Sequence, residues 1–282
     1  MSIADQALVG LGYALPSARR PLVHVTENGR ATGDSEVAEE IPVALVYNGR
    51  PHVVIMGTPT DLEDLAIGFS LTEGVVDSAN EIERVEVVRA SHGVELQLQI
   101  PNARADRVAE RSRGLASRTG CGLCGIESIH EALRMPGKVG SSLTVEADAL
   151  WRAGETLAER QELNRATNSV HAAAWADVDG TLRVVREDVG RHNALDKVLG
   201  AVLRADRSPA SGFVLVTSRA SYELVQKAAI CGVEVLAAIS RPTGLAIRFA
   251  DAAGVTLVAL LRGRSANIYS RPERIKGKAD NR

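Results

Sequence analysis

The chain has 282 residues, of which 45% are hydrophobic and 24% are charged, a composition that is ordinary for a globular protein. Its formal charge of −2 excludes a strong overall field that would attract nucleic acid or an anionic membrane. No apolar stretch reaches the length of a membrane-spanning helix, and the first residues lack the apolar block of a signal peptide. We therefore expect a cytoplasmic protein that binds neither nucleic acid nor membrane.

The N-terminal part predicts a mobile leader over residues 1–20 and a small α+β domain over residues 21–110. In this domain, two runs rich in β-branched residues flank the Asn-Gly pair at residues 48–49, which is a strong signal for a β-hairpin. Thr60 and Glu63 then predict a helix with Thr60 as its N-cap. Two further strand-like runs follow this helix.

Residues 111–125 are rich in arginine and glycine and predict a mobile loop, which carries Cys121 and Cys124. The arginines, together with the start of a helix expected over residues 126–135, would lower the pKa of these thiols and make a better thiolate. The third cysteine, Cys231, lies in an apolar stretch, and we interpret it as a small buried hydrophobic residue.

Four uses of the Cys-x-x-Cys pair compete. A structural zinc site would need two further cysteine or histidine ligands at suitable spacing, and the sequence has no second pair. A thioredoxin-like redox motif normally follows a strand, whereas this pair follows an irregular loop. A deaminase zinc site needs His-x-Glu and Pro-Cys-x-x-Cys, and here Gly120 replaces the proline. A persulfide carrier needs only an exposed, activated thiolate on a mobile segment, which fits this sequence best.

Residues 126–275 predict a second domain, and residues 276–282 predict a C-terminal tail. The later part of this domain alternates between short apolar runs and amphipathic segments, in the order strand, helix, strand, helix, strand. This order favours a mainly parallel sheet that is covered by helices. The expected fold class is therefore α/β, with a small N-terminal α+β unit and a larger α/β domain.

Three loops follow the carboxyl ends of the last predicted strands. In an open parallel sheet, ligands bind beyond these ends, where helix N-termini also favour anions. Arginine, serine and glycine recur in the three loops, and this recurrence predicts a pocket for phosphate groups or a nucleotide. Solvated loop residues are the alternative interpretation. The residues concerned are Ser218, Arg219, Arg241, Arg262, Gly263, Arg264 and Ser265.

A polar segment at residues 187–193 lies between a predicted strand and a predicted helix. An imidazole beside carboxylates titrates near neutrality, so His192 with Asp188 and Glu187 could carry acid–base chemistry. The segment is equally compatible with a helix start that Asp188 caps and in which His192 is structural. We interpret His171, which precedes three alanines, as structural.

Six segments within residues 36–272 form one set of motifs, which includes TGCGLCG around the cysteines and EDVGRHNALDK at the polar segment. They lie at residues 41–49, 58–74, 119–125, 187–197, 218–232 and 267–272. Together they resemble the formate dehydrogenase accessory sulfurtransferase family (FdhD). Their joint occurrence is highly specific, whereas the Cys-x-x-Cys pair alone is not.

The resemblance implies a homodimer without a metal site, whose larger domain is cytidine-deaminase-like. It implies that a cysteine desulfurase loads persulfide sulfur onto Cys121, that Cys124 assists or accepts in turn, and that formate dehydrogenase depends on this sulfur. The sulfur would pass to the bis-molybdopterin guanine dinucleotide cofactor, which is bound only transiently and which GDP would mimic. The matching cofactor-binding stretch is Leu260, Leu261, Arg262, Gly263, Arg264 and Ser265, to which we add Ser218, Arg219, Arg241 and His192.

One motif departs from the family pattern, because Thr167-Asn168-Ser169 stands where members commonly have Thr-Gly-Gly or Thr-Gly-Cys. Two other functions remain open. A thiol–disulfide regulatory protein would use the same cysteines for redox exchange. A nucleotide-binding chaperone would shield the cofactor, and its cysteines would only contact the partner.

Overall fold

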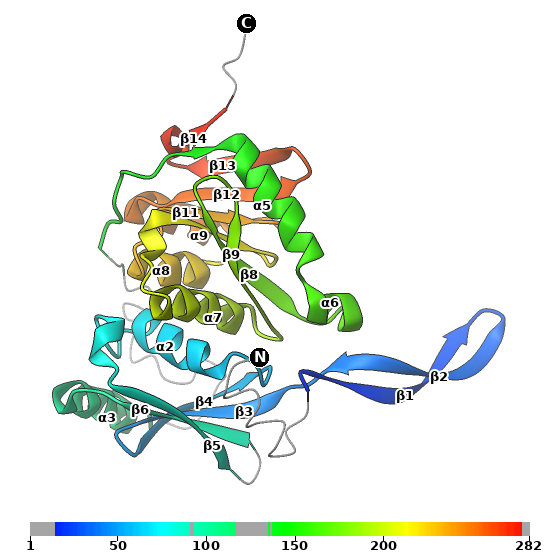
Figure 1. Ribbon diagram of the computed structural model, residues 1–282, viewed down its shortest axis with the longest axis horizontal. Coiled ribbons are helices and arrows are strands. Elements are labelled where there is room, and N and C mark those ends of the chain that lie inside the picture. Colours follow the sequence, from blue (N-terminus) through cyan, green and yellow to red (C-terminus); the bar gives the residue numbers. More distant parts are fainter. Residues whose placement is uncertain (1–14, 91–92, 117–134, 136, 278–282) are drawn as a thin grey trace, which may run out of the picture.

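The computed structural model describes residues 15–90, 93–116, 135 and 137–277. The chain forms two α/β units that pack on one another (Figure 1). A two-stranded arm, made of β1 (Ser17–Thr26) and β2 (Gly29–Ala38), projects from the smaller unit. The expected α/β class, with a small N-terminal unit and a larger second unit, is confirmed. In the described part of the chain, no helix is long and apolar enough to cross a membrane.

The N-terminal unit is a four-stranded sheet in the order β4-β3-β6-β5, with helices α2 and α3 on one face. Buried residues such as Leu45 and Leu96 alternate with less buried ones along the strands, as in a sheet that is covered on one side. The expected hairpin forms between β3 and β4, where Asn48 and Gly49 take positive φ angles of 50° and 76°. The elements are β3 (Ile41–Tyr47), β4 (Arg50–Gly57), α2 (Leu62–Thr72), β5 (Arg84–Ala90), β6 (Gly93–Gln99) and α3 (Asn102–Ala116).

The second unit has three layers around a six-stranded sheet of order β13-β12-β11-β10-β8-β9. The three central strands, β10, β11 and β12, are parallel, while β8, β9 and β13 add antiparallel edges. Val214 and Val216 of β10 face α7, α8 and α9, whereas Phe213 and Leu215 face α5, so both faces of the sheet are buried. The elements are α5 (Ala147–Glu159), α6 (Glu162–Thr167), β8 (His171–Asp177), β9 (Leu182–Asp188), α7 (Arg191–Arg204), β10 (Gly212–Val216), α8 (Tyr222–Ile230), β11 (Val235–Ala238), α9 (Gly244–Ala253), β12 (Thr256–Arg262) and β13 (Ser265–Ser270), with β7 (Val145–Glu146) paired to β14 (Ile275–Lys276).

The start of α2 differs from the prediction. The helix begins at Leu62, and its N-cap is Asp61, which has a left-handed φ of 51°, rather than Thr60. Asp61 makes no capping hydrogen bond, because its carboxylate lies 3.1 Å from the guanidinium of Arg186 in the second unit. A contact between the two units therefore replaces the capping box that the local sequence predicts.

Residues 147–167 form two helices, α5 and α6, rather than one continuous helix. Gln161 has a non-helical ψ of 76° and separates them. The second helix starts where the carboxylate of Glu187 accepts the N–H groups of Leu163 and Asn164, both at 2.8 Å. Glu187 thus accepts hydrogen bonds from N–H groups that have no partner within the helix, which is a structural role.

Three predicted segments overlap regular structure. The tail expected over residues 276–282 begins with Lys276, which lies in β14. Strand β1 (Ser17–Thr26) begins inside the leader expected over residues 1–20. Helix α3 continues to Ala116, so the first residues of the loop expected over 111–125 are helical. The rest of that loop lies outside the described residues, as does almost all of the helix expected over 126–135.

Helices α2 and α7 join the two units by direct contact of their backbones. A Cβ atom placed on Gly68 would lie 1.8 Å from the carbonyl oxygen of Asp196, and one on Gly200 would lie 1.9 Å from that of Asp64. Only glycine permits this approach, because any side chain would overlap the opposite backbone. The two glycines thus set the distance between the units.

Charged side chains surround this helix crossing. The carboxylate of Asp64 lies 2.8 Å from Arg186 and 2.6 Å from Arg204. Lys227 lies 3.0 Å from Asp196, and both side chains are almost fully buried. Burial raises the pKa of Asp196, although the neighbouring Lys227 opposes this rise. Each buried carboxylate is therefore compensated by a cation on the same or the opposite unit.

We expect Gly68→Ala to lower the free energy of unfolding by about 3 kcal/mol, because the methyl group forces α2 and α7 apart. Chemical denaturation measures this loss. Gly137→Ala is the control, since a Cβ at Gly137 would meet no atom within 4 Å, and a change below about 0.5 kcal/mol is expected there. Equal stability of the two variants would contradict the close packing of the helices.

Candidate functional site

The carboxyl ends of β10, β11 and β12 meet at one edge of the sheet, where hydrogen bonds join the loop after β10 to the loop after β11, and that second loop to the end of β12. The N–H of Thr243 donates to the carbonyl of Ala220 (3.0 Å), and the N–H of Leu260 donates to the carbonyl of Ser240 (3.2 Å). These bonds continue the contact between the strands beyond their ends. The three loops that the sequence singled out therefore lie side by side.

The binding residues that we expect at this edge fall into a buried group and an exposed group. Ser218 is buried and donates its hydroxyl to the carbonyl of Arg219 (3.1 Å), and Leu261 is part of the core under α5. Leu260 is half-buried and has a left-handed φ of 55°, so it bends the end of β12. Six residues are exposed, and their polar groups can reach a ligand: Arg219, Arg241, Arg262, Gly263, Arg264 and Ser265.

Helices α7, α8 and α9 all begin at the same edge. Their first N–H groups and the positive ends of their dipoles favour a negatively charged ligand. Thr243 caps α9 by accepting the N–H of Ala246 (3.2 Å), whereas Ser221, the N-cap of α8, makes no capping hydrogen bond. The first N–H groups of α8 are thus not capped by the side chain of Ser221, and they can donate to a ligand at this edge.

Two buried donors at this edge have no hydrogen-bond partner among the described residues. They are Nε of Arg191, in the first turn of α7, and Oγ of Ser221. Buried polar groups are nearly always paired, so such atoms indicate a ligand or an ordered water. Phosphate oxygens would satisfy both, and the edge therefore has the donors that an anionic nucleotide requires.

The first turns of α7 and α8 are joined by His192, whose Nε2 lies 2.8 Å from Oε2 of Glu223. The hydrogen bond with His192 lowers the pKa of Glu223. His171 lies at the start of β8, opposite Asp188, and its pKa is lowered by burial and then by the charges of Arg191 and His192. His171 is therefore neutral near pH 7 and belongs to the same electrostatic cluster.

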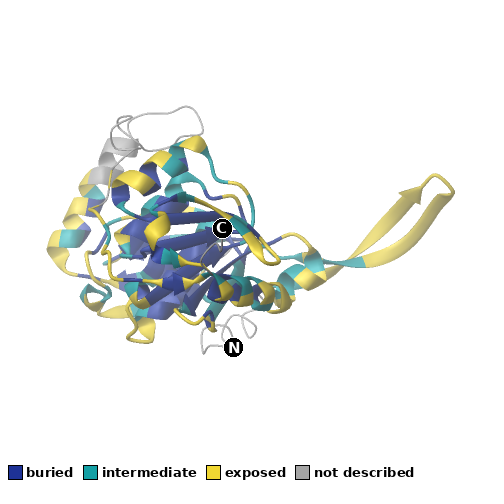
Figure 2. Cartoon of the chain, turned by 90° about the horizontal axis from the view of Figure 1, so that it is seen from above, coloured by how far each residue is buried: buried dark blue, intermediate teal, exposed yellow. Residues whose placement is uncertain are grey.

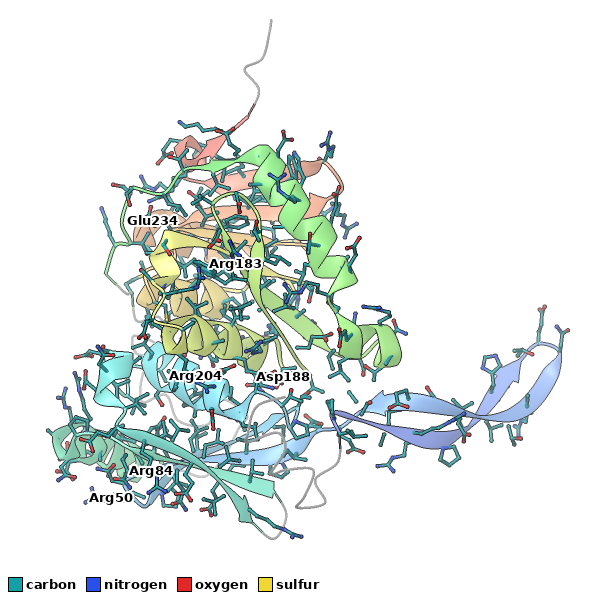
Figure 3. The ribbon with its side chains drawn as sticks, viewed as in Figure 1. Arg50, Arg84, Arg183, Asp188, Arg204 and Glu234 are labelled. Atoms are coloured by element: carbon teal, nitrogen blue, oxygen red, sulfur yellow. The ribbon has the colours of Figure 1, made fainter. Side chains whose placement is uncertain are left out.

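Asp188 has a structural role at the boundary between the units (Figure 3). Its carboxylate is fully buried, lies 2.6 Å from Nζ of Lys197, and accepts the N–H of Thr58 (3.1 Å) and the N–H of Gly190 (2.8 Å). Lys197 in turn donates to the carbonyl of Thr58 (3.0 Å). The polar segment therefore joins the two units through Asp188, and the helix cap expected from Asp188 is replaced by this contact.

Three side chains of this edge were missed by the sequence analysis. Arg191 lies inside the polar segment, but arginine at a helix start gave no separate signal. Ser221 and Glu223 resemble an ordinary helix start, and only the packing of α8 beside α7 brings them to the site.

Cys121 and Cys124 lie outside the described residues. Cys231 packs against the cores of both units, and burial raises its pKa to about 12. Its thiol is thus protonated at neutral pH and is a poor nucleophile, as expected from its apolar sequence context. The part of the chain that the structure describes contains no group of three or more metal-ligating side chains.

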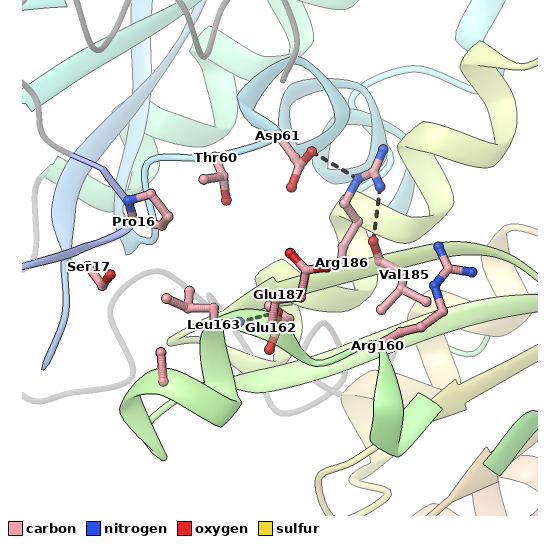
Figure 4. A pocket seen from close by; sticks show the side chains of 11 residues that line it. Pro16, Ser17, Thr60, Asp61, Arg160, Glu162, Leu163, Val185, Arg186 and Glu187 are labelled. Carbon is pink, nitrogen blue, oxygen red and sulfur yellow. Dashed lines mark hydrogen bonds and ion pairs between the residues drawn. The ribbon is translucent and has the colours of Figure 1, made fainter. Parts of the chain in front are cut away.

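A pocket of about 490 Å³ lies apart from the strand ends, where the base of the arm meets α2, α6 and β9 (Figure 4). Arg186 lies in this pocket, 3.1 Å from Asp61. The carboxylate of Glu187 already accepts two N–H groups at the start of α6. Because these charges compensate one another, this pocket is not the anion site that the sequence predicted.

The FdhD/NarQ family model matches residues 38–276, which is most of the sequence. The chain belongs to this family. The sulfur carrier protein FdhD of Xanthomonas euvesicatoria is 50% identical over 245 residues, 87% of each chain. That of Cupriavidus necator is 49% identical over 244 residues, 86% of this chain and 85% of its own. A crystal structure assigned as a formate dehydrogenase accessory protein from Desulfotalea psychrophila has a TM-score of 0.75 and 27% identity, and covers 93% of this chain and 100% of its own.

The backbone conformation explains why this FdhD/NarQ chain can carry asparagine at residue 168, where members of the family commonly have glycine. Asn168 ends α6 with a left-handed φ of 51°. Glycine is favoured in this conformation, and asparagine is among the side chains that adopt it most readily. The substitution of asparagine for glycine therefore preserves the turn into β8.

We expect NMR titration to give His171 a pKa below its ordinary value of about 6.5. Arg191→Met should raise that pKa, because it removes a positive charge that disfavours protonation. Arg50→Met, which alters an exposed pair on the other unit, serves as the control and should leave it unchanged. An unaltered His171 titration in Arg191→Met would contradict the described cluster.

Proposed function

We propose that this chain is a sulfur carrier for formate dehydrogenase, which takes persulfide sulfur from a cysteine desulfurase and delivers it to the bis-molybdopterin guanine dinucleotide cofactor. The observation that carries the proposal is the 50% identity, over 87% of the chain, with proteins named sulfur carrier protein FdhD. The likeness to a formate dehydrogenase accessory protein supports the same role. On this proposal the chain acts in the cytoplasm as a sulfurtransferase.

In the loading step, the thiolate of Cys121 attacks the terminal sulfur of the desulfurase persulfide. The S–S bond of the donor breaks, the desulfurase cysteine leaves as a thiolate, and Cys121 keeps the sulfane sulfur without net oxidation or reduction. Cys124 is the second thiol, which assists the transfer or accepts the sulfur in turn. Cys231 takes no part, because its thiol is buried and protonated.

The cofactor is cargo that the chain binds only during delivery. Its guanine dinucleotide phosphates are anionic, and the strand-end edge supports their binding through three helix N-termini and the buried, unpaired donors of Arg191 and Ser221. On this proposal Ser218 and Ser265 border the ligand and the exposed arginines hold its phosphates, namely Arg219, Arg241, Arg262 and Arg264. His192 orients the first turn of α7 through Glu223.

Intact mass after incubation with a cysteine desulfurase and cysteine tests the carrier reaction. We expect the wild-type chain to gain sulfur that a reductant removes, and Cys121→Ala to lose this gain. Cys231→Ala is the matched control and should load like the wild type. A disulfide without added sulfur would instead indicate the thiol–disulfide regulatory protein, and unimpaired loading of Cys121→Ala would refute Cys121 as the acceptor.

Calorimetric titration with GDP tests the strand-end site. We expect the double substitution Arg262→Ala, Arg264→Ala to weaken GDP binding at least tenfold, which is about 1.4 kcal/mol, because two charge-assisted contacts are lost. Arg50→Ala and Arg84→Ala, both exposed on the N-terminal unit, are the controls and should bind GDP like the wild type. Unchanged affinity in the double variant would refute this site.

A further inference from the structure

One carboxylate at the strand-end edge is accessible to a ligand. The strands of the second unit are buried at the centre of the molecule, so a ligand meets loops and helix starts (Figure 2). The side chain of Glu223, in the first turn of α8, is 42% exposed. By contrast, the carboxylate of Asp188 at the same edge is fully buried against Lys197. A carboxylate repels phosphate, so Glu223 suits a different part of an anionic ligand.

Glu223 keeps acceptor capacity for a ligand. Its Oε2 lies 2.8 Å from Nε2 of His192, and its Oε1 has no hydrogen-bond partner among the described residues. The hydrogen bond with His192 and the positive charge of Arg191 hold the pKa of Glu223 below its ordinary value. At neutral pH the group is therefore an ionised carboxylate, which accepts hydrogen bonds and donates none.

The backbone beside this carboxylate offers donors. The first hydrogen bond within α8 runs from the N–H of Val225 to the carbonyl of Ser221 (3.2 Å). The N–H groups of Glu223 and Leu224 precede it, and the side chain of Ser221 does not cap them. The start of α8 thus presents N–H donors next to carboxylate acceptors.

We propose that Glu223 reads the guanine base of the ligand and that His192 positions its carboxylate for this contact. Guanine carries N1–H and a 2-amino group side by side, which match the two oxygens of a carboxylate, and its O6 can accept a helix N–H group. Adenine has a lone pair at N1, which a carboxylate repels. The inference rests on the proposed function, because it names the base that the strand-end site prefers.

The edge is long enough to separate the base from the phosphates. The loop after β12, which carries Arg262 and Arg264, and the start of α8, which follows β10, are separated by β11. Two steps of the usual strand spacing amount to roughly 10 Å. A nucleotide that lies along the edge can therefore bring its base to Glu223 while the two arginines hold its phosphates.

Glu223 also lies where a carboxylate stabilises a helix start, and Lys227 follows it by four residues on α8. This structural role and the proposed role predict opposite effects on binding. Removing a carboxylate that only stabilises the helix removes a charge that repels phosphate, so GDP and ADP should both bind at least as tightly as before. Removing a carboxylate that reads guanine should weaken GDP alone.

Calorimetric titration of the full chain with GDP, inosine diphosphate (IDP) and ADP tests the inference. IDP has the N1–H but lacks the 2-amino group, so the wild type should bind GDP most tightly and ADP least tightly. Glu223→Gln should weaken GDP at least tenfold, to about the affinity of IDP, without weakening ADP. His192→Ala should reduce the preference for GDP over ADP, and His192→Gln, whose amide can still donate to Glu223, should keep part of it. Glu155→Gln, an exposed position on α5, is the control and should bind like the wild type.

The outcomes separate this inference from the proposed function. If Glu223→Gln keeps the wild-type preference for GDP over ADP, the inference is overturned while the strand-end site and the sulfur carrier stand. Equal binding of GDP and ADP by the wild type has the same meaning. A wild type that binds no nucleotide overturns both the inference and the strand-end site, and it leaves sulfur loading on Cys121 to the mass measurement.

The pterin part of the cofactor carries the same pattern, an amino group and a ring N–H beside a carbonyl. GDP contains no pterin, so a GDP preference that Glu223→Gln removes assigns the carboxylate to guanine. Neopterin, which carries the pattern without phosphate, is the probe for the other source. If GDP and ADP bind equally, and neopterin binds the wild type but not Glu223→Gln, the carboxylate reads the pterin and the guanine assignment is overturned.

Discussion

The crossing of α2 and α7 is the constraint on which the rest of the molecule depends. Backbone contact at Gly68 and Gly200 brings the units so close that carboxylates become buried between them. The pair of Asp188 and Lys197 compensates one such charge and also binds the Thr58 loop. Removing one partner of a buried pair costs about 3–5 kcal/mol, because the other charge is left without water or counterion. Close packing and charge pairing therefore stabilise the same joint.

This joint also positions the strand-end edge. The residues of α7 that contact the N-terminal unit are spread along the helix, and α7 begins at the strand-end edge. The contacts that hold the two units together therefore also fix the position of Arg191. The loops after β10 and β11 and the end of β12 are joined there by backbone hydrogen bonds. On the proposed function, an edge made from helix starts and loop backbone needs few specialised side chains to bind an anion, and its exposed arginines would select for the anionic ligand.

Features set by local patterns could be predicted from the sequence. The Asn-Gly hairpin, the parallel strands and the loops at their ends follow from local conformational preference and hydrophobic periodicity. Features set by contacts between distant residues could not. Asp61 replaces Thr60 as the N-cap of α2, because the carboxylate of Asp61 forms an ion pair with Arg186. Ser221 lies at the strand-end edge because α8 packs beside α7. The projecting arm could not be predicted, because the exposure of its valines depends on the whole fold.

The most direct measurement is formate dehydrogenase activity in cells that lack the chain and are complemented with its variants at equal expression. If the chain carries sulfur on Cys121, Cys231→Ala should restore activity like the wild type, and Cys121→Ala should restore none. Full activity with Cys121→Ala would contradict the carrier role and would leave the nucleotide-binding chaperone as the function.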